Sequence, residues 1–414
     1  MVTGAAAPRR FAALRDRNSR PYLFTAGLSM MGDNIEHVIT YWVLWQEFHS
    51  PALAGFQVIS HWLPFLLLSV WFGGLADKYD CRKLIQIAQG LFMFVSVCWA
   101  VLFLTGTLQV WEACVLLVLH GCAGALWAPA EQLLLQDFAE PADLPGAVRM
   151  NATFRSLGIL AGPIVGSVLL VGLGPAWGMF ANVVFYLPMT LLMFRTPFTG
   201  HTRSGYIHRA RLTILDGFRV LRSVGGDPVL VAMISLAGLV ALCVGGSLQV
   251  AIPAFADALG AGSEGLGYGL LLFANGVGGV VGGFVLEATG VLKPTTRVVA
   301  WATVLFGVTT LVVATTGSYA IAVLALLIGG VANLVSTSIG QAVVQLRAPV
   351  EKRGQVVGVY NMFGSGLRTG NGITIALLGG AIGVGGATAV GGAALVVGTL
   401  VIAVLALRGR RAAV

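Results

Sequence analysis

Long apolar segments alternate with short polar ones along almost the whole chain, from Pro21 to Leu407. A helix needs about 20 mainly apolar residues to cross the hydrocarbon core of a membrane, and about twelve segments approach that length. All are expected to be helical, because lipid offers no partner to an unpaired backbone group. The expected spans are 21–46, 53–76, 84–105, 110–136, 147–171, 175–195, 228–256, 265–288, 297–315, 319–346, 354–379 and 384–407.

One connection is much longer than the others and divides the spans into two sets of six. The pattern predicts an all-α integral membrane protein with two six-helix halves. Within the linker, Leu212 to Leu221 has apolar residues at helical spacing beside Arg219 and Arg222, which is typical of a helix lying on a membrane surface. The expected parts are an N-terminal segment 1–20, a bundle 21–195, the linker 196–227, a second bundle 228–407 and a tail 408–414.

Positive charge gathers in both terminal segments and in the connections that lead from an even-numbered span to an odd-numbered one. Because short cytoplasmic loops collect Lys and Arg, both termini are expected on the cytoplasmic side of the inner membrane. We therefore attribute the net charge of +8 to basic residues on the cytoplasmic side that contact anionic lipids, and not to nucleic-acid binding. The content of 57% hydrophobic and 10% charged residues is also typical of a membrane protein.

The sequence shows few signs of catalysis or of a bound group. Five scattered cysteines form neither a disulfide framework nor a metal site. We find no nucleophile–base pair, no cluster of metal ligands and no ATP-binding motif, so we expect no enzyme activity and no cofactor. Any transport must then draw on an ion gradient or on the substrate gradient.

Ionisable residues stand out inside the first span. Asp33, Glu36 and His37 share one helical face. Buried ionisable residues are costly in a membrane and usually line a pathway or relay protons, so this cluster is predicted to load and release protons. The alternative is that one of the acids neutralises a buried arginine. Aromatic residues and a further histidine are expected to form the wall of the same cavity: Tyr41, Trp42, Trp45, His61 and Trp62.

Two arginines also fall inside spans, Arg155 in the fifth and Arg368 in the eleventh. A buried guanidinium needs a carboxylate, from the protein or from a substrate. Asp33, Glu36 and Glu131 are the available protein acids. We expect Glu131, which lies toward the cytoplasmic end of the fourth span, to join a gate instead.

The two halves carry a faint internal repeat. Gln132 and Gln136 of the fourth span recur as Gln341 and Gln345 of the tenth. Asn151 and Gly162 of the fifth span similarly recur as Asn361 and Gly372 of the eleventh. Two related six-span halves are the architecture of a large class of secondary transporters.

The loop GGLADKYDCRKL at 73–84 resembles the signature loop of the major facilitator superfamily. The resemblance implies a latch. Gly73 allows close helix approach, Asp77 accepts hydrogen bonds from a helix N-terminus of the opposite half, and Arg82 and Lys83 pair with nearby carboxylates, with Glu131 near Arg82. The alternative is an ordinary basic loop with a turn.

The fifth span holds Gly158, Gly162, Pro163 and Gly166 in a G-x3-G-P-x2-G pattern, similar to the antiporter signature of the same superfamily. A kink without directional meaning is the alternative. In the fourth span, His120 stands where many drug antiporters have arginine. It is either a titratable group in mid-membrane or a packed neutral histidine.

The first 190 residues or so resemble the exporter branch that contains enterobactin-type siderophore exporters and macrolide-efflux proteins, with lysophospholipid transporters as near neighbours. The resemblance implies proton-driven export of an amphiphilic small molecule by alternating access, from a monomer in contact with membrane lipids. A lipid flippase-like carrier and an uncoupled facilitator remain alternatives, as does a scaffold or sensor that transports nothing.

Overall fold

The computed structural model describes residues 10–48, 51–203, 220, 222, 224–245, 251–252, 255–256, 258–260, 266–290 and 292–412. Every regular element within these ranges is a helix. Those of the N-terminal half are α1 (Ala12–Arg15), α2 (Ser19–Phe48), α3 (Pro51–Lys78), α4 (Cys81–Thr105), α5 (Val110–Phe138) and α6 (Leu144–Arg195). Those of the C-terminal half are α8 (Pro228–Cys243), α10 (Leu266–Thr289), α11 (Thr296–Thr315), α12 (Tyr319–Arg347), η1 (Val350–Lys352), α13 (Arg353–Asn361), the π-helix η2 (Met362–Gly366) and α14 (Arg368–Ala412).

Seven of the described helices are long and apolar enough to cross a membrane. Two helices are continuous in outline but broken by one glycine each. Gly174 divides α6 at a φ of 78°, and Gly383 divides α14 at a φ of 76°. Only glycine adopts such angles without strain, so each glycine allows a tight reversal between two spans. The breaks fall where the sequence predicts the fifth span to end and the twelfth to begin.

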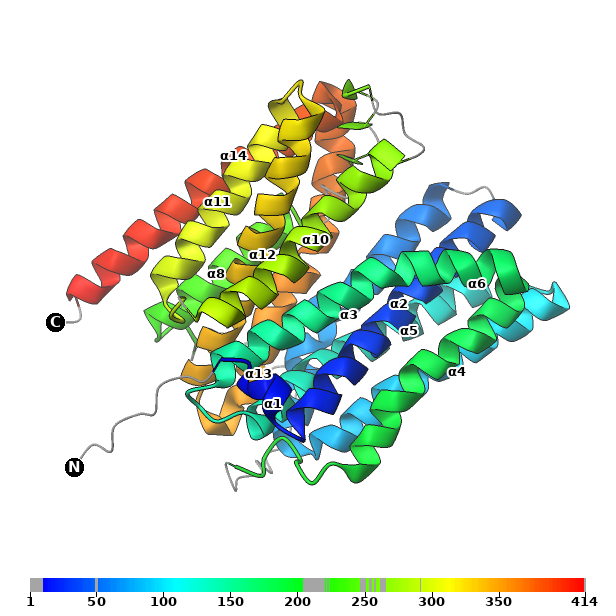
Figure 1. The fold of residues 1–414 in the computed structure, drawn as a ribbon, viewed down its shortest axis with the longest axis horizontal. Coiled ribbons are helices and arrows are strands. Elements are labelled where there is room, and N and C mark those ends of the chain that lie inside the picture. Colours follow the sequence, from blue (N-terminus) through cyan, green and yellow to red (C-terminus); the bar gives the residue numbers. More distant parts are fainter. Residues whose placement is uncertain are drawn as a thin grey trace.

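The helices form two bundles that lie side by side, α2–α6 in one and α8–α14 in the other (Figure 1). Both chain ends lie at the same end of the molecule, which we call the terminal side. Between the bundles, α3 contacts α13 and η2, and α6 contacts α10 and α12. These six elements therefore form most of the interface that must rearrange if the bundles move against each other.

The glutamines of the internal repeat meet across this interface. The Nε2 of Gln136 donates to Oε1 of Gln345 at 3.3 Å, and Nε2 of Gln345 lies 3.5 Å from Oε1 of Gln132. Gln132 in turn donates to Oδ1 of Asn361 at 3.2 Å. Equivalent positions of the two halves thus face each other near the terminal side, as expected for halves related by pseudo-symmetry.

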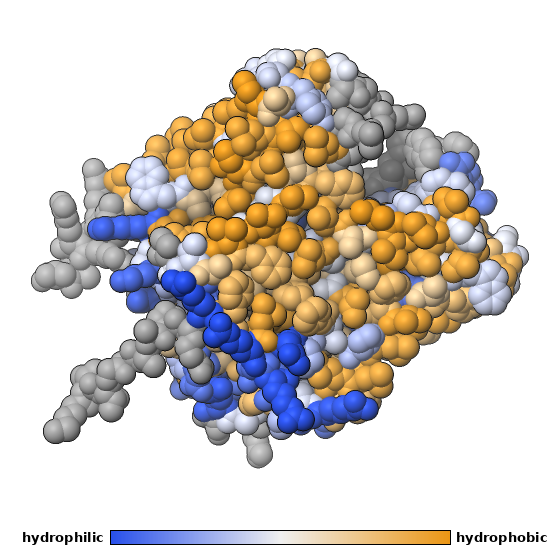
Figure 2. Space-filling model, viewed as in Figure 1, coloured by the Kyte–Doolittle hydropathy of each residue, from blue (hydrophilic) through white to orange (hydrophobic). Residues whose placement is uncertain are grey.

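The surface is that of a protein surrounded by lipid. Figure 2 shows apolar residues over the middle of both bundles and hydrophilic residues gathered toward the terminal side. Large apolar side chains such as Val171 (86% exposed) and Phe194 (72% exposed) would be unfavourable in water, and patches of this extent mark contact with an apolar phase. The surface helix expected at Leu212 to Leu221 lies almost wholly outside the described residues.

Candidate functional site

The ionisable cluster is held in place by the glycine pattern of α6. A side chain at Gly158 would collide with the backbone oxygen of Gly27 in α2. A Cβ at Gly162 would lie 2.5 Å from the Cβ of Asn34, and one at Gly166 would lie 3.2 Å from the Cα of Ile35. The two helices therefore pack backbone to backbone along the stretch that carries the cluster, as small residues allow in membranes.

Pro163, the fourth member of the pattern, lies within continuous helix. The only non-helical backbone in α6 is at Gly174, eleven residues further on. The glycines of the pattern therefore act here by close packing against α2.

His120 of α5 lies between two carboxylates of α2. Its Nε2 is 2.8 Å from Oδ1 of Asp33, and its Nδ1 is 2.8 Å from Oε1 of Glu36. The other oxygen of Glu36 accepts a hydrogen bond of 2.8 Å from the Ser96 hydroxyl. Asp33, Glu36 and His120 are 8%, 2% and 3% exposed, so bulk water cannot screen their charges.

The position of His120 between two carboxylates favours a protonated imidazole. A neutral imidazole has one N–H, so it can donate to only one carboxylate. The Nε2 contact with Asp33 is a hydrogen bond, whereas Nδ1 lies 2.8 Å from Glu36 as an ion-pair contact without hydrogen-bond geometry. A proton on each ring nitrogen would place a positive charge between the two carboxylates. Asp33, Glu36 and His120 can therefore act as one proton-binding unit.

Two further histidines extend the cluster toward the C-terminal half. The Nδ1 of His37 lies 4.0 Å from Oδ2 of Asp33. The His37 ring is 4.8 Å from the ring of His61, 5.1 Å from that of His120 and 5.2 Å from that of Tyr41. The predicted wall thus includes Tyr41 and His61. Trp42 is 49% exposed and has no ring contact with these residues.

The cluster also corrects one expectation from the sequence, that metal ligands do not gather in this chain. Ligand atoms of Asp33, His37, His61 and His120 all lie within 4.8 Å of one another, a grouping that could hold a metal ion. Periodicity could not reveal it, because the residues come from three helices. In this structure Oδ1 of Asp33 and Nε2 of His120 contact each other at 2.8 Å.

The two intramembrane arginines differ in their surroundings. Arg155 forms an ion pair with Glu131 and lies 4.7 Å above the Trp127 ring. The amide of Asn151 donates to the other oxygen of Glu131 at 3.0 Å. This geometry corrects the expected place of Glu131, which lies in the arginine pair and not in a gate with Arg82. The guanidinium of Arg368 also lies 4.7 Å above a tryptophan ring, that of Trp62, but it has no ion pair with a described residue.

The signature loop lies on the terminal side. Arg82 forms an ion pair with Asp80 at 2.7 Å and donates to the backbone oxygen of Thr196 at 2.8 Å. Asp80 also caps α4 by accepting from the Arg82 backbone N–H at 2.9 Å. Lys83 is exposed. Arg82 therefore stabilises the loop and the start of α4 within the N-terminal half, and Lys83 has no ion pair with a described residue.

Asp77 makes the contact between halves that the loop motif implies. Its Oδ1 accepts from the backbone N–H of Gly354 at 2.5 Å, and its Oδ2 accepts from that of Gln355 at 2.9 Å. Both donors belong to the first turn of α13, where free N–H groups favour an anion. Any side chain on Gly73 would collide with the backbone oxygen of Gly354, so this glycine allows the approach.

A second latch, which the sequence reasoning missed, joins the halves beside the first. Arg149 near the start of α6 donates to Oε2 of Glu287 in α10 from Nη2 at 2.6 Å and from Nε at 3.0 Å. The other oxygen of Glu287 accepts from the backbone N–H of Phe11 at 2.9 Å. Glu287 lies near the end of the eighth span as Asp77 does in the second, so the repeat could have indicated it.

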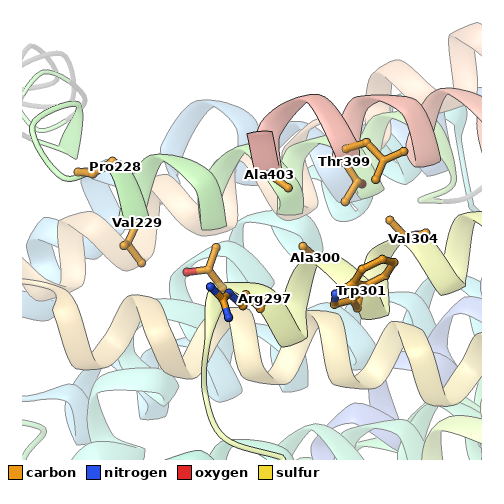
Figure 3. Close-up of a pocket in the computed structure, with 10 residues that line it drawn as sticks. Pro228, Val229, Arg297, Ala300, Trp301, Val304, Thr399 and Ala403 are labelled. Carbon is orange, nitrogen blue, oxygen red and sulfur yellow. The ribbon is translucent and has the colours of Figure 1, made fainter. Parts of the chain in front are cut away.

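A separate pocket of about 220 Å³ lies on the outside of the C-terminal bundle, between α8, α11 and α14 (Figure 3). Its walls are mostly apolar, and its lining residues share no ring contact or ion pair with the histidine cluster. We therefore do not assign it to the central site. The lining residues are Pro228, Val229, Thr296, Arg297, Ala300, Trp301, Val304, Thr399, Leu400 and Ala403.

With this geometry in hand, comparison with known proteins gives the family. The sequence profile of the family described as "Transmembrane secretion effector" (MFS_3) matches residues 9–413. The chain belongs to this family. It is thus a transporter of the major facilitator superfamily, and its family and fold are those of transporters rather than enzymes.

Among characterised relatives, the staphyloferrin A transporter of Staphylococcus aureus (strain NCTC 8325 / PS 47) is 25% identical over 173 residues. That match covers 41% of this chain and 44% of the relative, so the chain spans less than half of it in the aligned part.

Solved structures of the superfamily share the whole fold. The human organic anion transporter MFSD10 (TETRAN) superposes with a TM-score of 0.73 at 14% identity, over 92% of this chain and 99% of that one. A bacterial homologue of the iron transporter ferroportin gives 0.68 at 18% identity, over 92% and 97%. At such identities the likeness establishes the fold alone, which is the expected twelve-helix architecture in two halves.

Proposed function

We propose that this protein is a proton-coupled exporter of an amphiphilic small molecule, working by alternating access across the cytoplasmic membrane. The observation that carries the proposal is His120, placed 2.8 Å from a carboxylate oxygen on each side. Such a group holds a proton in the membrane interior and can release it when the carboxylates are separated or hydrated.

The coupling follows from which helices carry the three groups. Asp33 and Glu36 lie on α2, whereas His120 lies on α5, and α2 and α5 have few direct contacts with each other. A small shift between these helices during alternating access would change both contacts of His120 at once. Proton affinity would then differ between the two states, which is what coupling requires.

The expected orientation of the protein in the membrane, with the terminal side in the cytoplasm, is consistent with export. Lys and Arg gather on the terminal side, which we therefore place in the cytoplasm. Both latches join the halves on that side, so the described state is closed on the side that we place in the cytoplasm. Protons would enter the cluster from outside in this state. The glycine pattern of α6, and the description of the family as secretion effectors, support export.

The substrate class follows from the relatives only in outline. The related staphyloferrin A transporter and the structurally similar organic anion transporter both handle small organic molecules, by their names. The part-exposed His37, His61 and Trp62 beside the cluster would offer such a molecule an aromatic, amphipathic contact surface.

The test is proton release from purified protein on addition of candidate ligands: a lipophilic cation, a macrolide, a catecholate siderophore and a lysophospholipid. We expect release with one class, and its loss in Glu36→Gln. Glu112→Gln is the matched control, because Glu112 is an acid in the first turn of α5 that caps the exposed helix end through the Gln109 N–H.

Ligand binding without proton release would overturn proton antiport and favour an uncoupled facilitator or a flippase-like carrier. Equal proton release in wild type and Glu36→Gln would keep antiport but exclude this cluster as its site. In the second case, the Glu131–Arg155 pair would be the next buried acid to test.

A further inference from the structure

Arg368 is a cation inside the membrane region for which the described protein supplies no counter-charge. It begins α14, directly after the π-helix η2 and Leu367, and its guanidinium lies 4.7 Å above the ring of Trp62 in the opposite half. No hydrogen bond or ion pair joins its side chain to any described residue, and its Nε is buried without a partner.

Arg155, the other intramembrane arginine, has an acidic partner. Its guanidinium also lies 4.7 Å above a tryptophan ring, that of Trp127, and it is neutralised by Glu131. The two arginines stand at comparable depths of the two halves, so the same stacking arrangement is present twice. Among the described residues, only Arg155 of these two arginines has an acidic partner.

Stacking alone does not offset the partial burial of Arg368, whose Nε is removed from solvent. A cation–π contact contributes about 2 kcal/mol when desolvated, whereas removing an ion from water costs several kcal/mol even after relaxation. Ionisable residues inside a membrane protein mark substrate or ion pathways. The absent partner is then most simply part of the transported molecule.

The surroundings of Arg368 fit a ligand-binding position. Its Cγ would lie 2.8 Å from a Cβ at Gly245, so only a residue without a side chain at the end of α8 leaves this room. The adjacent π-helix is a local departure from regular helix of the kind that is frequent at functional sites. Trp62 is next to His61, whose ring is 4.8 Å from His37. Arg368 is therefore connected to the proton-binding cluster through three aromatic rings.

We propose that Arg368, lying on Trp62, binds an oxyanion of the transported molecule, either a carboxylate or a phosphate. This inference rests on the proposed transport function and names the substrate class more closely. The planar guanidinium offers two parallel N–H groups to one oxyanion, while the Trp62 ring contacts the apolar part next to it. The substrate then has two poles, an anion at Arg368 and a group at the Asp33–Glu36 end that displaces the proton.

The test uses ligands that share an octyl chain and differ in the head group: nonanoate, octyl phosphate, nonanamide and octyltrimethylammonium. Binding to the full-length protein in nanodiscs is measured by calorimetry. We expect wild type to bind one or both anions about tenfold or more tightly than the neutral amide, because a charge-assisted, bidentate contact is lost with the amide. Preference for octyl phosphate would indicate a lipid-like head group, and preference for nonanoate a carboxylate substrate.

Arg368→Gln should weaken anion binding about tenfold and leave the cationic ligand unchanged. Arg368→Lys should keep part of the anion affinity. Arg347→Gln is the control, because Arg347 pairs with Asp227 on the terminal side. Equal affinity of wild type for nonanoate, octyl phosphate and nonanamide would overturn the proposal without any variant, so the test does not depend on whether Arg368→Gln folds.

The failure of this inference and that of the proposed function are distinguishable. If the anions bind no more tightly than the neutral amide while ligand-induced proton release persists, only the oxyanion site is wrong. If the anions bind at Arg368 but no ligand releases a proton, the site stands and proton coupling fails.

Discussion

The chemistry of single residues depends on where each proton is held. The ring of His120 contacts two carboxylates, although a neutral imidazole carries only one N–H. Glu36 is fixed on its other side by Ser96, which in turn accepts a hydrogen bond from Asn182. These supporting hydrogen bonds hold Glu36 in place from a third and a sixth span. Small movements of His120 therefore change proton affinity more than they change the positions of the acids.

Replacing His120 by Asn should abolish transport driven by a pH gradient. Two buried carboxylates would lose their shared partner, and leaving a buried charge unpaired costs about 3–5 kcal/mol. We therefore also expect a lower temperature of thermal unfolding in detergent. Flux in proteoliposomes and scanning fluorimetry measure the two effects.

The control for this variant is Trp42→Phe, because Trp42 is half-exposed and lies outside the ring contacts of the cluster. It should transport as wild type does. A His120→Asn protein with unchanged pH dependence of flux would exclude the histidine from coupling.

At the scale of elements, the glycine pattern of α6 sets the position of α2. The pattern resembles an exporter signature, and its glycines face the segment Gly27 to Val38, which carries the acids. The glycine seam, where Gly158, Gly162 and Gly166 pack against α2, thus contacts the same helix that carries Asp33 and Glu36. A change in the seam should reach the site by moving α2 as a whole.

Gly162→Ala should reduce transport while the protein still inserts into the membrane. The added methyl would lie 2.5 Å from the Cβ of Asn34, and overpacking of this kind typically costs about 1–3 kcal/mol. Gly172→Ala in the same helix is the matched control, because nothing lies within 4 Å of a Cβ there. Initial rates of uptake into inverted vesicles compare the two. Equal rates in both variants would show that the seam does not position the site.

At the scale of the whole molecule, the state of the transporter is set by two latches of different chemistry. Asp77 uses the free N–H groups at a helix start, whereas Glu287 uses the guanidinium of Arg149. Each acid ends a span of one half and reaches the beginning of a span in the other. The pseudo-symmetry of the fold thus appears in the gate as well as in the bundles.

Asp77→Asn and Glu287→Gln should each shift the population toward the state that is open on the terminal side. Hydrogen bonds to charged groups contribute about 1.5–3 kcal/mol, which corresponds to a shift of about tenfold or more for each variant. The two free energies should add in the double variant if the latches act independently. Distances between spin labels at the terminal-side ends of α5 and α12 measure the populations. Unchanged distance distributions in the double variant would contradict the latch assignment.

Much of the fold was predictable because its signals are local. Apolar length predicts the spans, and the 73–84 loop predicts the contact of Asp77. The orientation expected from the basic residues stays a prediction. What was not predictable depends on partners that meet in space. The sequence left open whether Arg155 pairs with Glu131, and whether the partner of Arg368 belongs to the protein or to a substrate. It also placed Glu131 beside Arg82, because depth along a span says nothing about which neighbouring helix a side chain faces.

The contact between Phe11 and Glu287 has a practical consequence. Phe11 has a φ of 53°, which is rare for a residue with a side chain, and its backbone N–H is attached to the acid of the second latch. The start of the chain is therefore tied to the part of the molecule that must separate during each cycle. A fluorophore attached next to Phe11 would report gate opening in real time, whereas purification tags are better placed at the other end of the chain.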